Sequence, residues 1–163
     1  NVLWVLPYFL WLLIATSLNA YIYFKNWPSL ICFLQQIQVF LFADADGKPF
    51  SGKNKYTLTF DMNDLPPVTQ FWSIPIYDAN GYFVANEINR YTVNSFMLAA
   101  GDIVPKDGKL VIYIQHEKPS DPEQAKNWLP APAEGFRFTS RFYGPYAPLT
   151  NGTYNMPKVF KVN

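Results

Sequence analysis

Apolar residues are arranged in two different ways along the chain. Residues 2–24 form one continuous, uncharged and mostly apolar run, whereas apolar and polar residues alternate in short segments from residue 39 onward. A helix needs roughly 20 predominantly apolar residues to span a bilayer, because the hydrocarbon core is about 30 Å thick. The first pattern therefore predicts one transmembrane helix over residues 1–25, and the second predicts a β-rich domain behind it.

The ends of the apolar run carry the aromatic residues that are typical of membrane interfaces. They are Trp4 and Tyr8 near one end, and Tyr21, Tyr23 and Trp27 near the other. The alternatives are a signal peptide and a buried core helix. A signal peptide requires a basic first region and a small-residue cleavage site, and the run shows neither. Because Lys25 is the only charged residue among the first 43, it is weak evidence for the orientation of the helix.

Residues 26–38 have the pattern of a short amphipathic helix. Leu30, Ile31, Leu34 and Ile37 fall on one helical face, and Pro28 suits the first turn. This helix is predicted to connect the membrane span to the domain. Its position along the membrane surface or against the domain stays open.

Residues 39–163 are predicted to form a mainly β, antiparallel sandwich. Strict alternation marks residues 56–60, 110–114 and 136–142, and further strands are expected at residues 39–42, 71–77, 82–84 and 158–162. Asn80-Gly81 is the strongest hairpin turn. Pro75 lacks an N–H, so its strand is expected to lie at a sheet edge or to carry a bulge.

Charge and composition exclude several classes of function. Of 13 basic residues, the 12 after Lys25 are balanced by 12 acidic residues, so the domain is neutral and lacks the basic patch that nucleic-acid binding needs. Cys32 is the only cysteine, which excludes an intrachain disulfide or a cysteine metal cluster. No metal-ligand or phosphate motif is present, and the sequence predicts no cofactor.

The candidate catalytic groups are isolated. His116 is the only histidine, no nucleophile-elbow motif accompanies it, and its place at a strand end favours a solvated side chain. Asp44 and Asp46 lack the further ligands of a calcium loop, so a polar turn is expected there. Asp61 and Asp64 are a carboxylate pair of the kind that glycosidases use, although two loop aspartates are more often solvated. No catalytic residue is assigned.

A polar and aromatic group is the best candidate for ligand binding. Its members are Asn86, Arg90, Tyr91, Asn127, Trp128, Arg141 and Tyr143. Arginine binds carboxylates bidentately, and tryptophan or tyrosine offers a stacking surface. The structural alternative is that the arginines bond backbone carbonyls while the aromatic rings fill the core. A binding site requires Arg90, Arg141, Tyr143 and Trp128 to converge on one open pocket.

Several stretches together resemble the family of the domain of unknown function numbered 1214. They are DADGKPFSGKNKYTLTF (44–60), LPPVTQFWSIPIYDANGYFV (65–84), NEINRYTVNS (86–95), DGKLVIYIQ (107–115), NWLPAP (127–132), FRFTSRFYGP (136–145) and GTYNMPKV (152–159). The resemblance implies a jelly-roll-like sandwich of bacterial origin, usually the C-terminal partner of the domain numbered 1254. Here a membrane segment is expected in place of that companion. The family implies no catalytic residues.

Two functional hypotheses follow. The first is a non-enzymatic accessory or structural subunit, anchored in the lipid bilayer by a single span, whose periplasmic domain docks onto other membrane protein subunits. The second is a small-ligand-binding or hydrolytic sandwich that uses the Arg/Tyr/Trp/Asn group.

Overall fold

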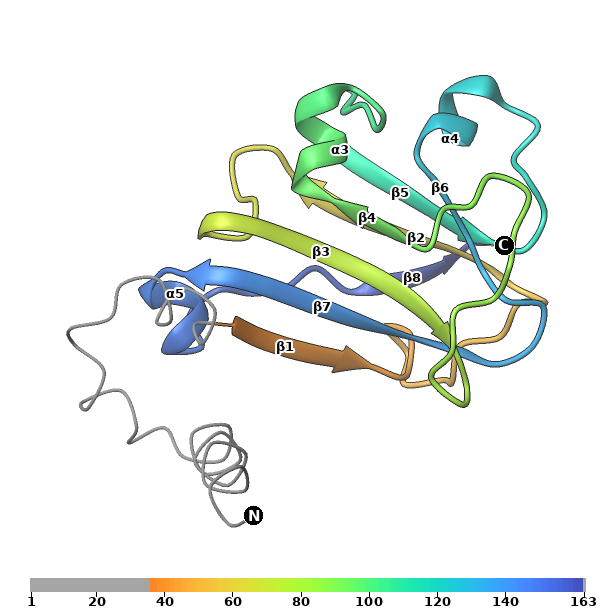
Figure 1. Ribbon diagram of the computed structural model, residues 1–163, viewed down its shortest axis with the longest axis horizontal. Coiled ribbons are helices and arrows are strands. Elements are labelled where there is room, and N and C mark those ends of the chain that lie inside the picture. The colour runs from red at the N-terminus through yellow and green to blue at the C-terminus, as the bar shows by residue number, and fades with distance from the viewer. Residues whose placement is uncertain (1–35, 163) are drawn as a thin grey trace, which may run out of the picture. The chain divides into compact units, whose positions relative to one another are not determined.

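The computed structural model describes residues 36–162, which form two four-stranded sheets (Figure 1). The first sheet has the order β1-β7-β3-β4, and the second has the order β6-β5-β2-β8. All strand pairs are antiparallel except β5 with β6. The strands are β1 (Gln36–Leu41), β2 (Lys55–Asp61), β3 (Val68–Asp78), β4 (Thr92–Asn94), β5 (Lys109–Gln115), β6 (Trp128–Pro130), β7 (Phe136–Pro145) and β8 (Val159–Val162), and the helices are α3 (Ser95–Ala100), α4 (Pro122–Lys126) and α5 (Ala147–Thr150). The predicted mainly β sandwich is confirmed.

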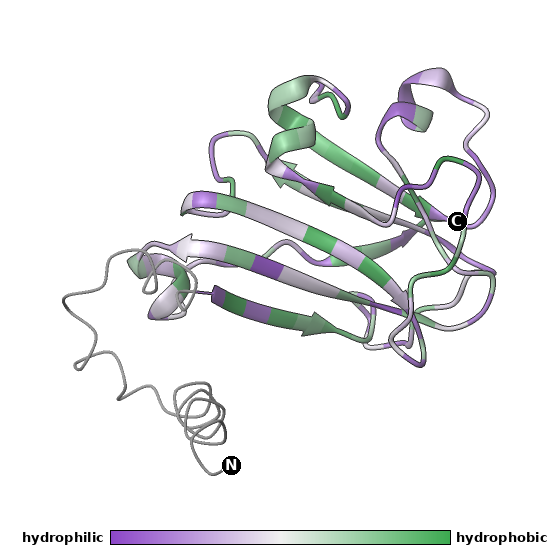
Figure 2. Cartoon of the chain, in the orientation of Figure 1, coloured by the Kyte–Doolittle hydropathy of each residue, from purple (hydrophilic) through white to green (hydrophobic). Residues whose placement is uncertain are grey.

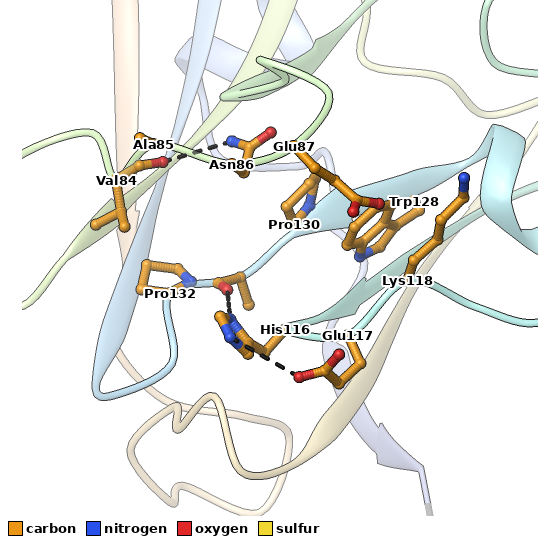
Figure 3. Close-up of a pocket in the computed structure, with 11 residues that line it drawn as sticks. Val84, Ala85, Asn86, Glu87, His116, Glu117, Lys118, Trp128, Pro130 and Pro132 are labelled. Carbon is orange, nitrogen blue, oxygen red and sulfur yellow. Dashed lines mark hydrogen bonds and ion pairs between the residues drawn. The ribbon is translucent and has the colours of Figure 1, made fainter.

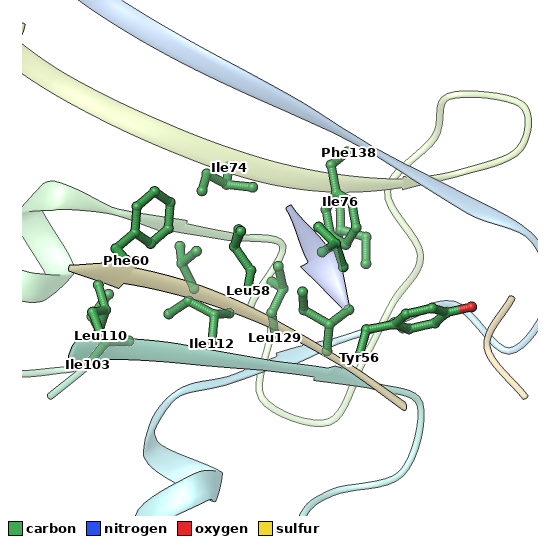
Figure 4. Close-up of a cluster of buried hydrophobic side chains, with 14 of the residues drawn as sticks. Tyr56, Leu58, Phe60, Ile74, Ile76, Ile103, Leu110, Ile112, Leu129 and Phe138 are labelled. Atoms are coloured by element: carbon green, nitrogen blue, oxygen red, sulfur yellow. The ribbon is translucent and has the colours of Figure 1, made fainter. Parts of the chain in front are cut away.

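The core lies between the sheets and follows the predicted alternation. Tyr56, Leu58 and Phe60 of β2 are buried, and they pair in register with the buried residues at 114, 112 and 110 of β5 (Figure 4). The first sheet contributes the inward residues of β3 and β7, including Trp72 and Phe138. Each such side chain contributes roughly 1.5–3 kcal/mol by leaving water.

One end of the core is built from aromatic rings. Phe50 stacks on Phe136 with ring centroids 5.2 Å apart, and Tyr56 meets both rings edge-on. The Tyr56 hydroxyl accepts hydrogen bonds from the Ser51 backbone N–H at 3.1 Å and from Asn54 Nδ2 at 3.2 Å. The loop before β2 is thereby tied to the core.

The predicted hairpin at Asn80-Gly81 forms its turn but lacks its second strand. The Asp78 N–H donates to the Tyr82 carbonyl at 2.9 Å, which closes the turn. Residues 82–84 then leave the sheet, because Phe83 stacks on the Tyr77 ring with centroids 4.7 Å apart. The strand expected over residues 82–84 is therefore wrong, and the three-residue strand β4 pairs with β3 instead.

Strand β1 begins at Gln36, three residues before the expected start. The last three residues of the helix predicted over residues 26–38 are therefore strand, because the segment pairs with β7 from Gln36↔Tyr143 onward while Ile37 and Leu41 pack on the core. The rest of that helix and the transmembrane helix predicted over residues 1–25 lie outside the described residues. Within residues 36–162, no helix has the length and apolar character needed to cross a membrane.

Two proline-containing strands depart from expectation. Pro75 does not lie on an edge strand, since β3 sits between β7 and β4, and the bulge in β3 falls between Val68 and Phe71 rather than at the proline. Strand β6 is not among the strands that the alternation predicts. It forms at the sheet edge, where the Ala131 N–H donates to the Gln115 carbonyl at 2.9 Å. Alternation turns the nitrogen of Pro130 away from β5, so its missing N–H is tolerated.

Candidate docking face

The outward side of the first sheet carries two arginines between aromatic rings. Phe138 and Phe142 of β7 point into the core, so Arg137, Arg141 and Tyr143 point outward. Along β1, polar and apolar residues alternate from Gln36 to Val39, and the end of the strand is apolar on both sides (Figure 2). We call this surface the outer aromatic face. Its residues are Phe40, Phe42, Phe71, Tyr77, Phe83, Tyr91, Phe96, Arg137, Arg141 and Tyr143, which come from β1 and the residue after it, β3, β7, the loop after β3 and α3.

The aromatic rings of this face lie in three groups. Phe40 and Phe42 stack with centroids 6.2 Å apart at the β1 side. Phe83 contacts Tyr77 at 4.7 Å and Tyr91 at 5.3 Å. The third group joins Tyr143 to Phe71 at 4.1 Å and Phe71 to Phe96 at 5.0 Å.

Four phenylalanines of the face remain more than half exposed despite these contacts. The exposed fractions are 55% for Phe40, 56% for Phe42, 53% for Phe83 and 61% for Phe96. Single exposed apolar residues are normal on protein surfaces, but several on one face mark an interaction site. The face is therefore the strongest candidate interface among the described residues.

The two arginines of the face are oriented by aromatic rings rather than by carboxylates. The Arg141 Nη2 donates to the Tyr77 hydroxyl at 2.7 Å, and its guanidinium lies 5.9 Å from the Tyr77 ring centroid. The Arg137 guanidinium lies 5.8 Å from the centroid of Phe42. The Nε–H groups of both arginines are buried and have no hydrogen-bond partner.

Gly81 makes room for Arg137. Gly81 has a φ of 92°, a backbone conformation that residues with a Cβ rarely adopt. A Cβ at this position would also collide with the Arg137 guanidinium. The turn that the sequence predicted at Asn80-Gly81 therefore also shapes the outer aromatic face.

Arg90 is bonded to backbone carbonyls. Its Nη1 donates to the carbonyl oxygens of Lys126 at 2.7 Å and Trp128 at 2.8 Å, and so ties the loop after β3 to the segment around β6. Burial lowers the pKa of the Arg90 guanidinium from its ordinary value, and the Asp102 carboxylate opposes this shift. Asn86 turns the same loop, since its Oδ1 accepts from the Arg90 N–H and its Nδ2 donates to the Arg90 carbonyl, both at 3.0 Å.

Asn127 and Trp128 are also held by backbone groups. Asn127 Oδ1 accepts from the Val104 N–H at 2.7 Å, and its Nδ2 donates to the Val104 carbonyl at 2.8 Å. Trp128 is buried, and its indole N–H donates to the Gln115 carbonyl at 2.9 Å. These contacts occupy the polar atoms that ligand binding would use.

Two hollows lie outside the outer aromatic face. The first has a volume of about 280 Å³ and is lined partly by Asn86, Trp128 and His116 (Figure 3). His116 Nδ1 donates to the Ala131 carbonyl at 2.9 Å, while Nε2 lies 4.0 Å from Glu117 Oε1. The second, of about 800 Å³, lies between α4 and β5.

The seven predicted ligand residues therefore fall in two places. Asn86, Arg90, Asn127 and Trp128 lie in the loop after β3 and around β6, whereas Tyr91, Arg141 and Tyr143 belong to the outer aromatic face. Tyr91 reaches Arg141 through the rings of Phe83 and Tyr77. Neither hollow is lined by Arg90, Arg141 or Tyr143.

The aspartate pairs form turns. Asp44 Oδ1 accepts from the backbone N–H groups of Asp46 at 3.0 Å and Lys48 at 2.9 Å, which confirms the predicted polar turn. Asp61 Oδ1 accepts from the Asn63 N–H at 2.8 Å, and the Asp64 N–H donates to the Asp61 carbonyl. Across the described part of the chain, no three His, Cys, Asp or Glu side chains are grouped to hold a metal ion.

Comparison with known proteins gives a family and a fold. The model of the family described as "Protein of unknown function (DUF1214)" matches residues 35–147. The chain is similar to the crystal structure of the VPA0106 protein from Vibrio parahaemolyticus, with 26% identity and a TM-score of 0.68 over 86% of this chain. The chain spans about a third of the length of that protein, with 33% of it covered. No curated protein matches.

Proposed function

Because this chain belongs to the DUF1214 family of proteins of unknown function, whose name assigns no activity, we propose a function from the surface of the domain. The domain is an accessory or structural module that docks onto a larger membrane protein assembly through the outer aromatic face. Residues 1–25 anchor it in the bilayer as a single helix, and the domain faces the periplasm.

The observation that carries this proposal is the exposure of Phe40, Phe42, Phe83 and Phe96 on one face. Aromatic side chains and arginine are enriched in the centres of protein interfaces, where lysine and acidic residues are depleted. The outer aromatic face matches this composition, since it holds two arginines and eight aromatic residues. The other outward positions of β1, β3, β4 and β7 are glutamine, serine, threonine, asparagine or proline, so these strands present no lysine, aspartate or glutamate on that side.

Two further expectations belong to the same proposal. The domain has a jelly-roll-like topology, and it corresponds to the C-terminal part of proteins that also contain the domain numbered 1254. The Vibrio protein supports a larger architecture, because this chain covers only 33% of it.

The alternative, a ligand-binding or hydrolytic sandwich, has weaker support. Arg90 and Asn127 are committed to backbone groups, and Trp128 is buried. These contacts favour the structural interpretation, in which the arginines bond backbone carbonyls and the aromatic rings fill the core.

Extraction of the full chain in mild detergent, followed by native mass spectrometry, tests the docking proposal. The wild-type chain is expected to travel with a protein partner in a fixed ratio. The double change Phe40→Ser and Phe42→Ser is expected to release that partner.

Phe160→Ser is the matched control, because Phe160 is 58% exposed on β8 of the other sheet. It is expected to leave the complex intact. A wild-type chain that is purely monomeric after extraction, or a partner that both variants retain equally, contradicts the proposal.

A further inference from the structure

We infer that the partner places carboxylate side chains against Arg137 and Arg141, so that the outer aromatic face recognises an acidic and apolar protein surface. This inference rests on the proposed docking function and adds the chemistry of the partner. Of the residues that the sequence selected for ligand binding, the face contains Tyr91, Arg141 and Tyr143.

The two arginines of the outer aromatic face have no internal counter-charge among the described residues. Two ion pairs are found among residues 36–162, Lys106 with Glu123 and His116 with Glu117, and neither contains an arginine. The outer aromatic face contains no aspartate or glutamate. Its two positive charges are therefore not neutralised by a carboxylate of the described domain.

Both guanidinium groups are already oriented and partly desolvated. Each lies against an aromatic ring, and each has a buried Nε–H without a partner. An arginine held in this way loses less conformational freedom when it binds, and its planar fork suits a carboxylate. A carboxylate at the outer edge of each guanidinium, flanked by Phe42 or Tyr77, gives a charge-assisted and water-excluded contact.

The charge of the outer aromatic face disfavours a second copy of the chain and an anionic membrane as its partner. A second copy of the chain, docked face to face, would bring arginines towards arginines with no carboxylate from either copy between them. Anionic membranes attract clusters of 4–8 lysines or arginines, whereas this face has two arginines and no lysine. An acidic protein surface is the occupant that complements both the charge and the aromatic rings.

The test uses the full chain in its native membranes, with the photo-reactive residue benzoylphenylalanine in place of Phe40. Irradiation is expected to join this position to a partner protein. The same residue in place of Phe160 is the positional control. The charge reversal Arg137→Glu with Arg141→Glu is expected to lower the adduct at position 40 by about tenfold or more.

Two matched variants separate charge from folding. Arg137→Lys with Arg141→Lys keeps the charge, so the yield of the adduct is expected to stay within about threefold of the wild-type yield. The small decrease is expected because lysine lacks the planar fork of N–H donors that binds a carboxylate. Lys55→Glu with Lys109→Glu makes the same charge change on exposed residues of β2 and β5 and is expected to have no effect. Mapping of the adduct is expected to locate aspartate or glutamate in the joined segment. Changing those acids to lysine is expected to restore the adduct of the charge-reversed chain, which a misfolded variant would not allow.

The outcomes distinguish the two proposals. An adduct to a partner protein that survives the charge reversal overturns the carboxylate inference and leaves the docking function standing. Adducts only to lipid or to a second copy, or none at position 40, overturn the docking function and the inference with it.

Discussion

The outward sides of the two sheets differ in which charged residues they carry and in how those charges are paired. On the second sheet, β2 and β5 present Lys55, Thr57, Thr59 and Lys109 outward, and the nearby Lys106 is paired with Glu123 at 2.6 Å. On the outer aromatic face, two arginines lie between aromatic rings without a carboxylate. The outward side of the second sheet also includes Val111 and Tyr113, which line the hollow between α4 and β5, and the exposed edge strand β8.

Within one sandwich, the inward residues of both sheets stabilise the fold, whereas the exposed residues of one outward side are available for binding. Both sheets use their inward residues for the shared core, so neither needs exposed phenylalanines in order to fold. A face that keeps four of them in water carries an apolar surface that folding alone does not explain. The following predictions test whether the two outward sides differ in this way.

The largest difference in the free energy of unfolding is expected between the loss of an inward ring and the loss of an outward ring of the same sheet. Phe142→Ala removes a side chain that is 1% exposed and is expected to lower the free energy of unfolding by about 3–5 kcal/mol through loss of burial and formation of a cavity. Phe40→Ala is expected to change it by less than about 0.5 kcal/mol. Denaturant unfolding measures both. A comparable loss for Phe40→Ala would mean that the outer aromatic face is a second core of this chain.

A smaller effect is expected from Asn127, which supports the segment beneath the second sheet's hollow. Asn127→Ala leaves the N–H and the carbonyl of Val104 without their side-chain partner. Val104 is 41% exposed, so water can reach these groups, and the loss is that of two ordinary hydrogen bonds, about 0.5–1.5 kcal/mol each. Equilibrium unfolding should show that loss. Asn63→Ala, at an exposed turn, is the control and is expected to be neutral. A neutral result for Asn127→Ala would remove its structural role and reopen a ligand role.

Tyr154, in the segment between α5 and β8, gives a pH-dependent test. Burial, with a smaller contribution from Asp64, raises the pKa of Tyr154 to about 12, and its hydroxyl donates to the Asp64 carbonyl at 3.2 Å. The neutral phenol is favoured in the folded state, so its contribution is complete below pH 10 and is lost as the pH rises towards 12. Because the group is only half buried, the contribution is about 1 kcal/mol after solvent screening.

The measurement is the difference in unfolding free energy between the wild type and Tyr154→Phe from pH 9 to about 12. This difference is expected to shrink as the pH rises, since the phenylalanine variant lacks the titrating group. A difference that stays constant over this range would contradict the raised pKa.

The smallest effect is expected from the ion pair near the second sheet. The Glu123 carboxylate raises the pKa of Lys106, yet both side chains are largely exposed. Exposed ion pairs contribute little, so Lys106→Ala should leave the melting temperature unchanged within error. A clear loss of thermal stability would show that charge pairing on this surface matters, which would weaken the contrast with Arg137 and Arg141.

The alternation of residues was sufficient to predict the central strands. Tyr56, Leu58 and Phe60 form a half-buried strand whatever pairs with them, and β5 has the same signal. The strands β4 and β6 were missed because each has only three residues and forms through pairing with a longer neighbour. Such pairings depend on tertiary contacts that local patterns do not contain.

The candidate site was predictable only in part. Alternation along β7 places Arg137 and Arg141 on one outward side, which the sequence indicates. It does not indicate that Phe83 leaves its expected strand to stack on Tyr77, or that Arg90 bonds two carbonyls of a segment nearly 40 residues later. Alternation also identifies which rings point outward without showing whether anything covers them.

The most direct test of the account is the accessibility of each outward side in native membranes. In a Cys32→Ser background, Gln38→Cys reports on β1 beside the outer aromatic face, and Phe160→Cys reports on the second sheet. The account predicts that maleimide labels position 38 at least about tenfold more slowly than position 160 in intact membranes, and that the two rates converge once the chain is purified. Equal labelling rates in the membrane would contradict the claim that a partner covers the outer aromatic face.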